Sequence, residues 1–467
     1  MLFSSITFLY YFLPCTGILY FAVPKRGRNM VLLAASLVFY GWGEPRFLIF
    51  MILAILGGYL SGRLIGACGQ NRKAARAVLA VFSVLCLGML AVCKYAGFLI
   101  ENFNRITGLS VPLLRIALPI GISFYTFQIL SYVIDVYRNT VPVQNSLISL
   151  GTYISMFPQL IAGPIVRYAD LAQELEKRTC SFEEAAAGIR HFAAGLSKKV
   201  LLANTLGELA EFCRGSAGPT VLSAWIYAAA FTLQIYFDFS GYSDMAIGLG
   251  RIFGFHFREN FRYPYTASSM TDFWRRWHIS LGTWFRDYLY IPLGGSRVPK
   301  ARWIFNLLVV WAATGLWHGA AWNFVLWGLF YAALLAAEKL WLGKILEKRK
   351  IAAHIYVILA AVLGFVLFNA VSLAEAADTF RAMFGLAGLP GAGADSLYAL
   401  RSYGPLLLTA ALGATPLPAR LWARLSVGRT GKMVCAAAEP AAAALLLLVC
   451  TAFLVDGSFN PFLYFRF

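Results

Sequence analysis

Two histidines lie in sequence surroundings that could support chemistry. His318 lies in the run 311–327, where its neighbours are apolar, aromatic or small. An ionisable ring is costly to bury in lipid, so it is a functional-site hypothesis by default. His278 ends the run 273–278, in which arginines and aromatic residues are mixed. The chain has only five histidines, so much depends on whether these two face one cavity.

The residues next to His318 are those expected around a catalytic base. Thr314 precedes it by one helical turn on the same face, so the threonine hydroxyl could reach the imidazole. Gly315 and Gly319 would leave room beside the ring for a substrate or another helix. A neutral histidine in an apolar pocket can act as a general base, because its pKa lies near working pH. The structural alternative is a core histidine that bonds a neighbouring helix.

The segment 273–297 mixes arginines with aromatic side chains. Arg275, Arg276 and Arg286 are candidates for binding an anionic ligand, because guanidinium groups fork onto phosphate oxygens. The alternative is an interfacial helix in an aromatic belt, with its arginines on the headgroup side. Placing a histidine such as His278 at the membrane interface costs little free energy, and a histidine there is often structural.

A third group of polar residues interrupts an apolar run. Gln234 and Asp238 share one helical face, and Tyr242 extends it, with Asp244 nearby. Buried carboxylates are rare in lipid and usually pair or line a wet cavity. These residues could orient an imidazole, bind a hydroxylated acceptor or carry protons. Asn323, which follows His318, is a further candidate for lining a tunnel.

Composition places the chain in a membrane. Of 467 residues, 60% are hydrophobic and 13% are charged. Several apolar runs reach the length of about 20 residues that crosses a bilayer, and they lack the alternation of barrel strands. We expect one all-α polytopic domain over residues 1–467. The expected spans are about 3–23, 30–42, 46–66, 77–99, 115–137, 146–165, 192–212, 219–253, 302–313, 316–342, 351–372, 403–413 and 433–456.

Three segments depart from the pattern of simple spans. Residues 167–199 are rich in charges and predict amphipathic helices on a membrane face. The short run 302–313 predicts half of a broken or re-entrant helix, and residues 385–402 predict a loop. Residues 1–23 lack a basic region before them, so we expect a retained first span and not a cleaved signal peptide.

The net charge of +18 has two interpretations. It can reflect positive-inside topology and contact with anionic lipid, or it can reflect binding of an anionic substrate such as a phosphorylated cofactor. No motif or soluble basic domain indicates a nucleic-acid partner. The eight cysteines form no CxxC pair, so they predict neither disulfides nor a metal site.

Two classes of function fit these residues. One is an intramembrane transferase, with a histidine base in a tunnel that an anionic donor and a hydroxyl acceptor both reach. The other is a proton-coupled transporter, with Asp238, Asp244 and His318 as a relay. Transporters often contain paired halves with matching broken helices. No such repeat is visible in this sequence, which favours the enzyme.

Several segments of the chain match the motifs of a known family, and they are 123–128, 157–164, 238–244, 273–297, 316–319 and 460–467. Together they resemble the membrane-bound O-acyltransferase (MBOAT) family, from about residue 3 to the end of the chain, and its bacterial branch of alginate O-acetylation proteins. The resemblance implies a bundle of about 10 to 13 helices, including interfacial or re-entrant helices, around a central tunnel. Its essential histidine falls on His318, and a second position, His or Asn in the family, falls on His278.

The resemblance also implies a reaction. His318 would act as the base, and His278 would orient the donor or steady the oxyanion. The donor would be acetyl-CoA or another acyl thioester, and no cofactor would stay bound. A secreted or membrane-anchored esterase-like partner would then acetylate a cell-surface polysaccharide outside a bacterial cytoplasmic membrane. D-alanyl transfer to teichoic acid is the alternative within the family.

Overall fold

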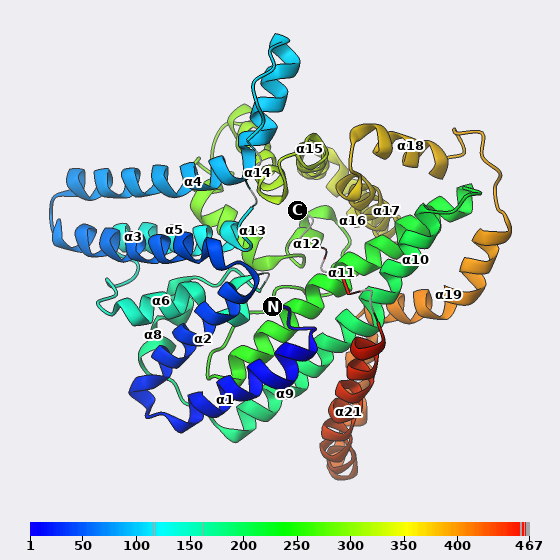
Figure 1. Ribbon diagram of the computed structural model, residues 1–467. Helices are drawn as coiled ribbons and strands as arrows, with labels where there is room; N and C mark the ends of the chain where they lie inside the picture. The colour runs from blue at the N-terminus through cyan, green and yellow to red at the C-terminus, as the bar shows by residue number, and fades with distance from the viewer. Residues whose placement is uncertain (115, 117, 162, 458–459, 462, 464–467) are drawn as a thin grey trace. The chain divides into compact units, whose positions relative to one another are not determined.

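The computed structural model describes residues 1–467 except 115, 117, 162, 458–459, 462 and 464–467 (Figure 1). Where described, the chain forms helices and no strand. Six helices of these residues are long and apolar enough to cross a membrane: Pro45–Ala67, Arg72–Thr107, Val221–Ile252, Trp322–Lys348, Lys350–Asn369 and Gly428–Asp456. The prediction of an all-α polytopic membrane protein is confirmed.

The contacts between residues divide the chain into two compact units. The N-terminal unit comprises residues 1–192 and 245–258, and the C-terminal unit comprises residues 193–244 and 259–467. The boundaries between them fall within α9 (Phe182–Ser197), within the last part of α11 (Val221–Ile252) and after residue 258. The prediction of a single domain stays a prediction.

The N-terminal unit is built from α1 to α8, the first part of α9 and the last part of α11. Their bounds are α1 Leu13–Ala22, α2 Arg28–Gly43, α3 Leu48–Ala67, α4 Arg72–Thr107, α5 Ile122–Tyr137, α6 Leu147–Ser155, α7 Phe157–Leu160 and α8 Tyr168–Glu176. α3 packs against both α4 and α5, and these three run side by side in Figure 1. The core is aromatic, with Phe8 in ring contact with Phe3, Phe39 and Phe157.

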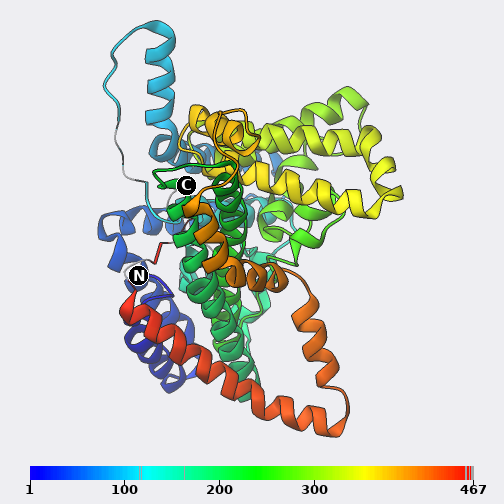
Figure 2. The ribbon, with the colours of Figure 1, turned by 90° about the vertical axis from the view of Figure 1, so that its right-hand side faces the viewer.

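The C-terminal unit carries the segments with the two histidines. It contains the end of α9 and the first part of α11. Its other helices are α10 Asn204–Arg214, α12 Met270–Trp274, α13 Ile279–Phe285, α14 Lys300–His318, α15 Trp322–Ala337, α16 Gly343–Lys348, α17 Lys350–Asn369, α18 Leu373–Met383, α19 Ala394–Gly413, α20 Leu417–Leu425 and α21 Gly428–Asp456. π-helical turns continue α13 over Arg286–Tyr290 and α15 over Glu338–Leu342. α15 packs against both α14 and α17, as Figure 2 shows in yellow-green and yellow.

Two glycines let α14 and α15 meet backbone to backbone. A Cβ at Gly315 would overlap the carbonyl group of Phe324, and a Cβ at Gly328 would overlap that of Trp311. Small residues allow such close approach between helices in membranes. The sequence predicted room beside His318 for a substrate or another helix. On the side of Gly315, α15 fills that space.

The structure corrects three predicted boundaries. The run 302–313, expected as half of a broken or re-entrant helix, does not end at 313, because α14 continues without interruption to His318. The chain breaks at 319–321, where Gly319 and Ala321 are extended, and so the predicted span 316–342 is wrong at its start. Residues 385–402 are not a loop throughout, since α19 begins at Ala394. Alanines favour helix there despite the nearby glycines.

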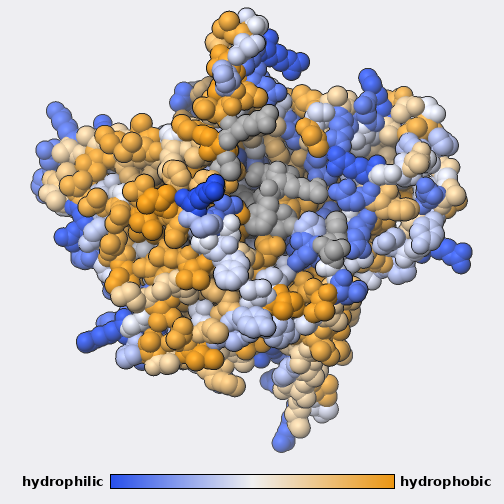
Figure 3. Space-filling view, in the orientation of Figure 1, coloured by the Kyte–Doolittle hydropathy of each residue, from blue (hydrophilic) through white to orange (hydrophobic). Residues whose placement is uncertain are grey.

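The outer surface of the helices matches a lipid environment. Long apolar side chains such as Val84, Leu85 and Leu448 are exposed on α4 and α21. Figure 3 shows broad apolar areas on the face that it presents. In water such areas would mark binding sites or aggregation, whereas in a bilayer they contact acyl chains.

The contact between α14 and α15 can be tested at Gly328. We expect Gly328→Ala to destabilise the protein by about 1–3 kcal/mol, because the added methyl group overpacks the contact with Trp311. The measurement is thermal unfolding of the detergent-solubilised protein. Gly88→Ala is the matched control, because a Cβ at Gly88 meets nothing within 4 Å. Equal melting temperatures for the two variants would contradict the close packing.

Candidate active site

A cavity of about 470 Å³ lies within the C-terminal unit, and both histidines line it. Its walls come from α12, α13 and the π turn after it, α14 and α15. Arg275, Arg286 and Thr314 also line it. Residues that are 40 positions apart in the sequence therefore meet at one space. The structure brings together five of the residues that the sequence singled out.

His318 is the last residue of α14. Its ring lies 5.0 to 5.1 Å, centroid to centroid, from the rings of Trp317, Trp327 and Phe368. The side chain is partly exposed, in contrast to that of His278. The C-terminal end of a helix carries partial negative charge and favours a positive charge nearby. A ring in this place is suited to taking up a proton.

Thr314 contributes less to His318 than its spacing suggested. Its hydroxyl group donates a hydrogen bond to the carbonyl of Val310 at 2.8 Å. The single hydroxyl proton is thus used within α14, and only a lone pair remains for a ring N–H.

His278 is held in an uncommon backbone conformation between α12 and α13. Its φ and ψ are 44° and 55°, in the left-handed region, which costs a non-glycine residue of order 1–3 kcal/mol. Asn260 holds this turn: its carbonyl accepts from the backbone N–H of Ile279 at 3.0 Å. Its side-chain Oδ1 accepts from the backbone N–H of Ser280 at 3.1 Å.

The imidazole of His278 is nearly enclosed, with 2% of its residue surface exposed. Its Nδ1 lies 3.2 Å from Asn260 Oδ1, and Phe239 packs edge-on against the ring at 4.7 Å. Burial lowers the pKa of His278 to about 3, so the ring is neutral at working pH. The sequence did not single out Asn260, because neither a left-handed turn nor a partner 18 residues away is visible in a local pattern.

The three candidate arginines have different surroundings. Arg275 and Arg286 are exposed and line the cavity. Arg286 also pairs with Asp287 at 2.6 Å. Arg276 pairs with Asp272 on its own helical face at 2.9 Å, and it is not among the residues that line the cavity. Two of the three arginines are thus placed to meet an anionic ligand there.

The polar residues of α11 make contacts away from the cavity lining. Asp238 pairs with Lys199 at 2.6 Å, and both side chains are 3% exposed. The carboxylate also accepts from the backbone N–H of Leu463 at 2.9 Å, and Lys199 donates to the carbonyl of Pro461. Asp244 pairs with Lys198 at 2.5 Å. Four residues that the sequence suggested for the tunnel lining are therefore absent from the described lining of the cavity: Gln234, Asp238, Tyr242 and Asp244.

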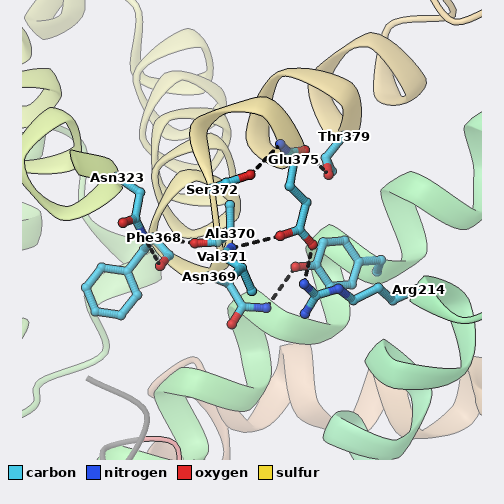
Figure 4. Close-up of polar contacts among 10 residues, drawn as sticks. Arg214, Asn323, Phe368, Asn369, Ala370, Val371, Ser372, Glu375 and Thr379 are labelled. Atoms are coloured by element: carbon cyan, nitrogen blue, oxygen red, sulfur yellow. Dashed lines mark hydrogen bonds and ion pairs between the residues drawn. The ribbon is translucent and has the colours of Figure 1, made fainter. Parts of the chain in front are cut away.

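Asn323 braces the chain where α17 ends. Its Nδ2 donates to the carbonyls of Phe368 at 3.2 Å and Ala370 at 2.9 Å, as Figure 4 shows. Just beyond, Glu375 accepts from the backbone N–H of Val371 and pairs with Arg214. Asn323 therefore positions Phe368, one of the rings around His318, and it lies outside the described lining of the cavity.

The match of the chain to known proteins defines its class. Residues 138–371 match the membrane-bound O-acyltransferase family, MBOAT. The chain belongs to this family, and it is a multi-pass membrane-bound O-acyltransferase. The family resemblance expected from the motifs is confirmed. The motif segments 157–164 and 460–467 lie partly outside the described residues.

The chain is similar in sequence to several bacterial enzymes, three of which are described next. The chain is 43% identical over 389 residues to the probable alginate O-acetylase AlgI of Azotobacter vinelandii, covering 82% of this chain and 78% of that protein. It is 32% identical over 426 residues to the peptidoglycan O-acetyltransferase of Helicobacter pylori, covering 83% and 81%. It is 29% identical over 231 residues to the teichoic acid D-alanyltransferase of Bacillus subtilis, covering 46% and 58%.

The pair Lys199–Asp238 predicts a structural effect. We expect Asp238→Asn to destabilise the protein by about 3–5 kcal/mol, because it leaves the buried Lys199 charge without its partner. The double variant Lys199→Met/Asp238→Leu removes both charges and should recover most of the loss. Thermal unfolding in detergent measures both variants. Asp244→Asn is the control, because its pair is more exposed, and such pairs contribute about 0–1 kcal/mol. A double variant no more stable than Asp238→Asn would contradict this role.

The buried His278 predicts a dependence of stability on pH. The unfolded chain takes up a proton at His278 as the pH falls through 6.5, whereas the folded protein does so only near 3. Acidification within that window therefore favours unfolding, by at most about 1.4 kcal/mol per pH unit. We expect the melting temperature of the wild type to fall more steeply than that of His278→Gln between about pH 7.5 and 5.5. Parallel curves would contradict the lowered pKa, because they would show that the folded ring takes up its proton at the same pH as the unfolded chain.

Proposed function

We propose that the protein moves an acetyl group from a cytosolic thioester to an extracytoplasmic hydroxyl, in a pathway of cell-surface polysaccharide O-acetylation. The observation that carries this proposal is the single cavity lined by His318, His278 and two exposed arginines. The names of the relatives support acetyl as the group transferred, since two of those cited are O-acetylating enzymes.

The proposed chemistry begins at His318. Its imidazole removes the proton from the attacking hydroxyl, whose oxygen forms a bond to the thioester carbonyl carbon. The carbon–sulfur bond then breaks, and the leaving thiolate takes up the proton. General base catalysis of this kind contributes about 10²–10⁴ to the rate. The position of His318 at the end of α14, where the helix dipole favours a cationic ring, supports the role.

Arg275 and Arg286 are the proposed contacts for the donor. Acetyl-CoA carries phosphates, and exposed guanidinium groups on the cavity wall can bind them bidentately. His278 is proposed to orient a substrate or to steady the oxyanion of the tetrahedral intermediate. These two roles differ in whether the ring nitrogen that faces the substrate accepts or donates a hydrogen bond.

The immediate acceptor is proposed to be a hydroxyl on a secreted or membrane-anchored esterase-like protein, which then acetylates the polysaccharide. The proposed location is the cytoplasmic membrane of a bacterium, with the whole chain acting as one membrane-embedded domain. The course of α9 and α11, each of which contributes residues to both compact units, supports a single domain.

Two alternatives have less support. D-alanyl transfer to teichoic acid is named for relatives that match 46% and 48% of this chain, about half of its length. A proton-coupled transporter would need Asp238 and Asp244 as a relay with His318, but both carboxylates are paired with lysines. The membership of the chain in an acyltransferase family also favours the enzyme.

The proposed function can be tested by acyl transfer in proteoliposomes. We expect the wild type to release CoA from acetyl-CoA in the presence of the partner protein or a soluble hydroxyl acceptor. His318→Ala should reduce the rate by about 100-fold or more, and His278→Ala should cause a smaller but clear loss. Both variants should still insert and accumulate.

His256→Gln is the matched control, because His256 pairs with Glu174 in the N-terminal unit and is mostly exposed. Its rate should equal that of the wild type. Full activity of His318→Ala would remove His318 from the chemistry. Transfer from a D-alanyl carrier protein with none from acetyl-CoA would favour the teichoic acid alternative.

A further inference from the structure

The two ring nitrogens of His278 have different surroundings. Nδ1 lies 3.2 Å from Asn260 Oδ1. Nε2, within the described residues, is buried without a hydrogen-bond partner in a ring that lines the cavity. Buried polar atoms are normally hydrogen-bonded, and an exception calls for an explanation. A partner on the substrate would provide one.

The orientation of the Asn260 amide follows from Ser280. The backbone N–H of Ser280 can only donate, and it points to Asn260 Oδ1 at 3.1 Å. The Ser280 hydroxyl also donates to this oxygen, at 2.9 Å. The amide is therefore not reversed, and its oxygen is the atom that faces His278.

This orientation decides which ring nitrogen carries the proton. A carbonyl oxygen has no hydrogen to donate, so the contact at 3.2 Å is a hydrogen bond only if Nδ1 bears the proton. The other tautomer would set two lone pairs against each other at that distance. The Ser280 hydroxyl lies farther from Nδ1, at 3.5 Å, and its proton is already directed to Asn260.

We propose that Asn260 fixes His278 as the Nδ1–H tautomer, so that Nε2 presents a lone pair to the substrate and accepts a hydrogen bond from its O–H or N–H group. His278 therefore orients a substrate and does not donate to the oxyanion. Asn260 is a positioning residue, since it acts through His278. The assignment to acyl transfer rests on the proposed function, whereas the tautomer does not.

The charges around the ring are consistent with a neutral acceptor. The rings in contact with His278 are those of Phe239, Phe261 and Trp317, which carry no charge. The ionisable side chains that share the cavity wall are Arg275, Arg286, Tyr290 and His318. Positive charge on the two arginines disfavours a positive charge on His278. Nε2 thus keeps its lone pair at working pH.

The tautomer can be measured directly on the full-length wild type. ¹⁵N NMR of the protein in nanodiscs, labelled at histidine, distinguishes a protonated from an unprotonated ring nitrogen, and His278→Gln identifies the signals that belong to His278. We expect Nδ1 to be protonated and Nε2 unprotonated. Protonation at Nε2 with a bare Nδ1 would overturn the proposal, whether or not the protein transfers acetyl groups.

The role in transfer can be tested with Asn260→Asp. This change keeps an oxygen that accepts from His278 Nδ1 and from Ser280. It breaks no hydrogen bond of Asn260 Nδ2, because that atom has no partner among the described residues. The new carboxylate favours the imidazolium, in which Nε2 becomes a donor. We expect the rate relative to wild type to be about tenfold lower or more at about pH 6, and to recover toward about pH 8.

The opposite sign would contradict the assigned role. If His278 served as an oxyanion donor, Asn260→Asp would match or exceed the wild type at low pH. The rate of the variant is divided by the rate of the wild type at each pH, so that the effect of His318 titration, which both proteins share, cancels. Asn71→Asp is the matched control, because Asn71 caps α4 with an exposed Oδ1 that accepts from the N–H of Ala74 at 3.1 Å. Its ratio should stay constant with pH.

Discussion

The backbone contact between α14 and α15 is the constraint on which the site depends. Because Gly315 and Gly328 carry no side chain, the two helices approach until each meets a carbonyl group of the other. The turn at 319–321 then has to be short and extended, which places His318 at the very end of α14. The same contact brings Trp327 of α15 against the histidine ring. The proposed catalytic base is thus positioned by the packing of two helices.

Lipid imposes a second constraint, which is that polar groups inside the protein must find partners within the chain. Buried Lys199 and Asp238 satisfy each other and also bind the backbone near the C-terminus. Buried Glu338 accepts from the backbone N–H groups of Met270 and Thr271, at the start of the short helix α12. The bonds of Glu338 fix the first residues of α12, a helix that lines the cavity.

His278 and His318 show how one residue type can serve two purposes in one cavity. Burial disfavours the cationic form of His278 and keeps its ring neutral. His318 lies at the end of α14 and is partly exposed, so the two rings differ in their surroundings. The family resemblance located both positions, but it did not distinguish their environments.

Several features could be predicted from the sequence because they depend on local composition. Apolar runs of spanning length indicated helices in a membrane, and the cost of burying His318 marked it for function. The end of α14 was misplaced, since the expected spans stopped at 313 and began again at 316 whereas the helix runs to His318. In the structure Gly315 serves a helix contact instead. Asp238 was expected near the chemistry because a buried carboxylate is rare in lipid. Its partner, Lys199, could not be recognised in the sequence, since it lies in another helical segment that was predicted only to be amphipathic.

The sequence by itself determined the class of the protein: a helical membrane protein with two exceptional histidines and the motifs of an O-acyltransferase. Only the tertiary structure decided that both histidines line one cavity, that two of three arginines join them, and that Asn260 contacts the ring of His278. The physical reason is the range of the forces involved. Transfer of apolar side chains into lipid is nearly additive along the chain, whereas a hydrogen bond depends on distance and direction between residues that only folding brings together.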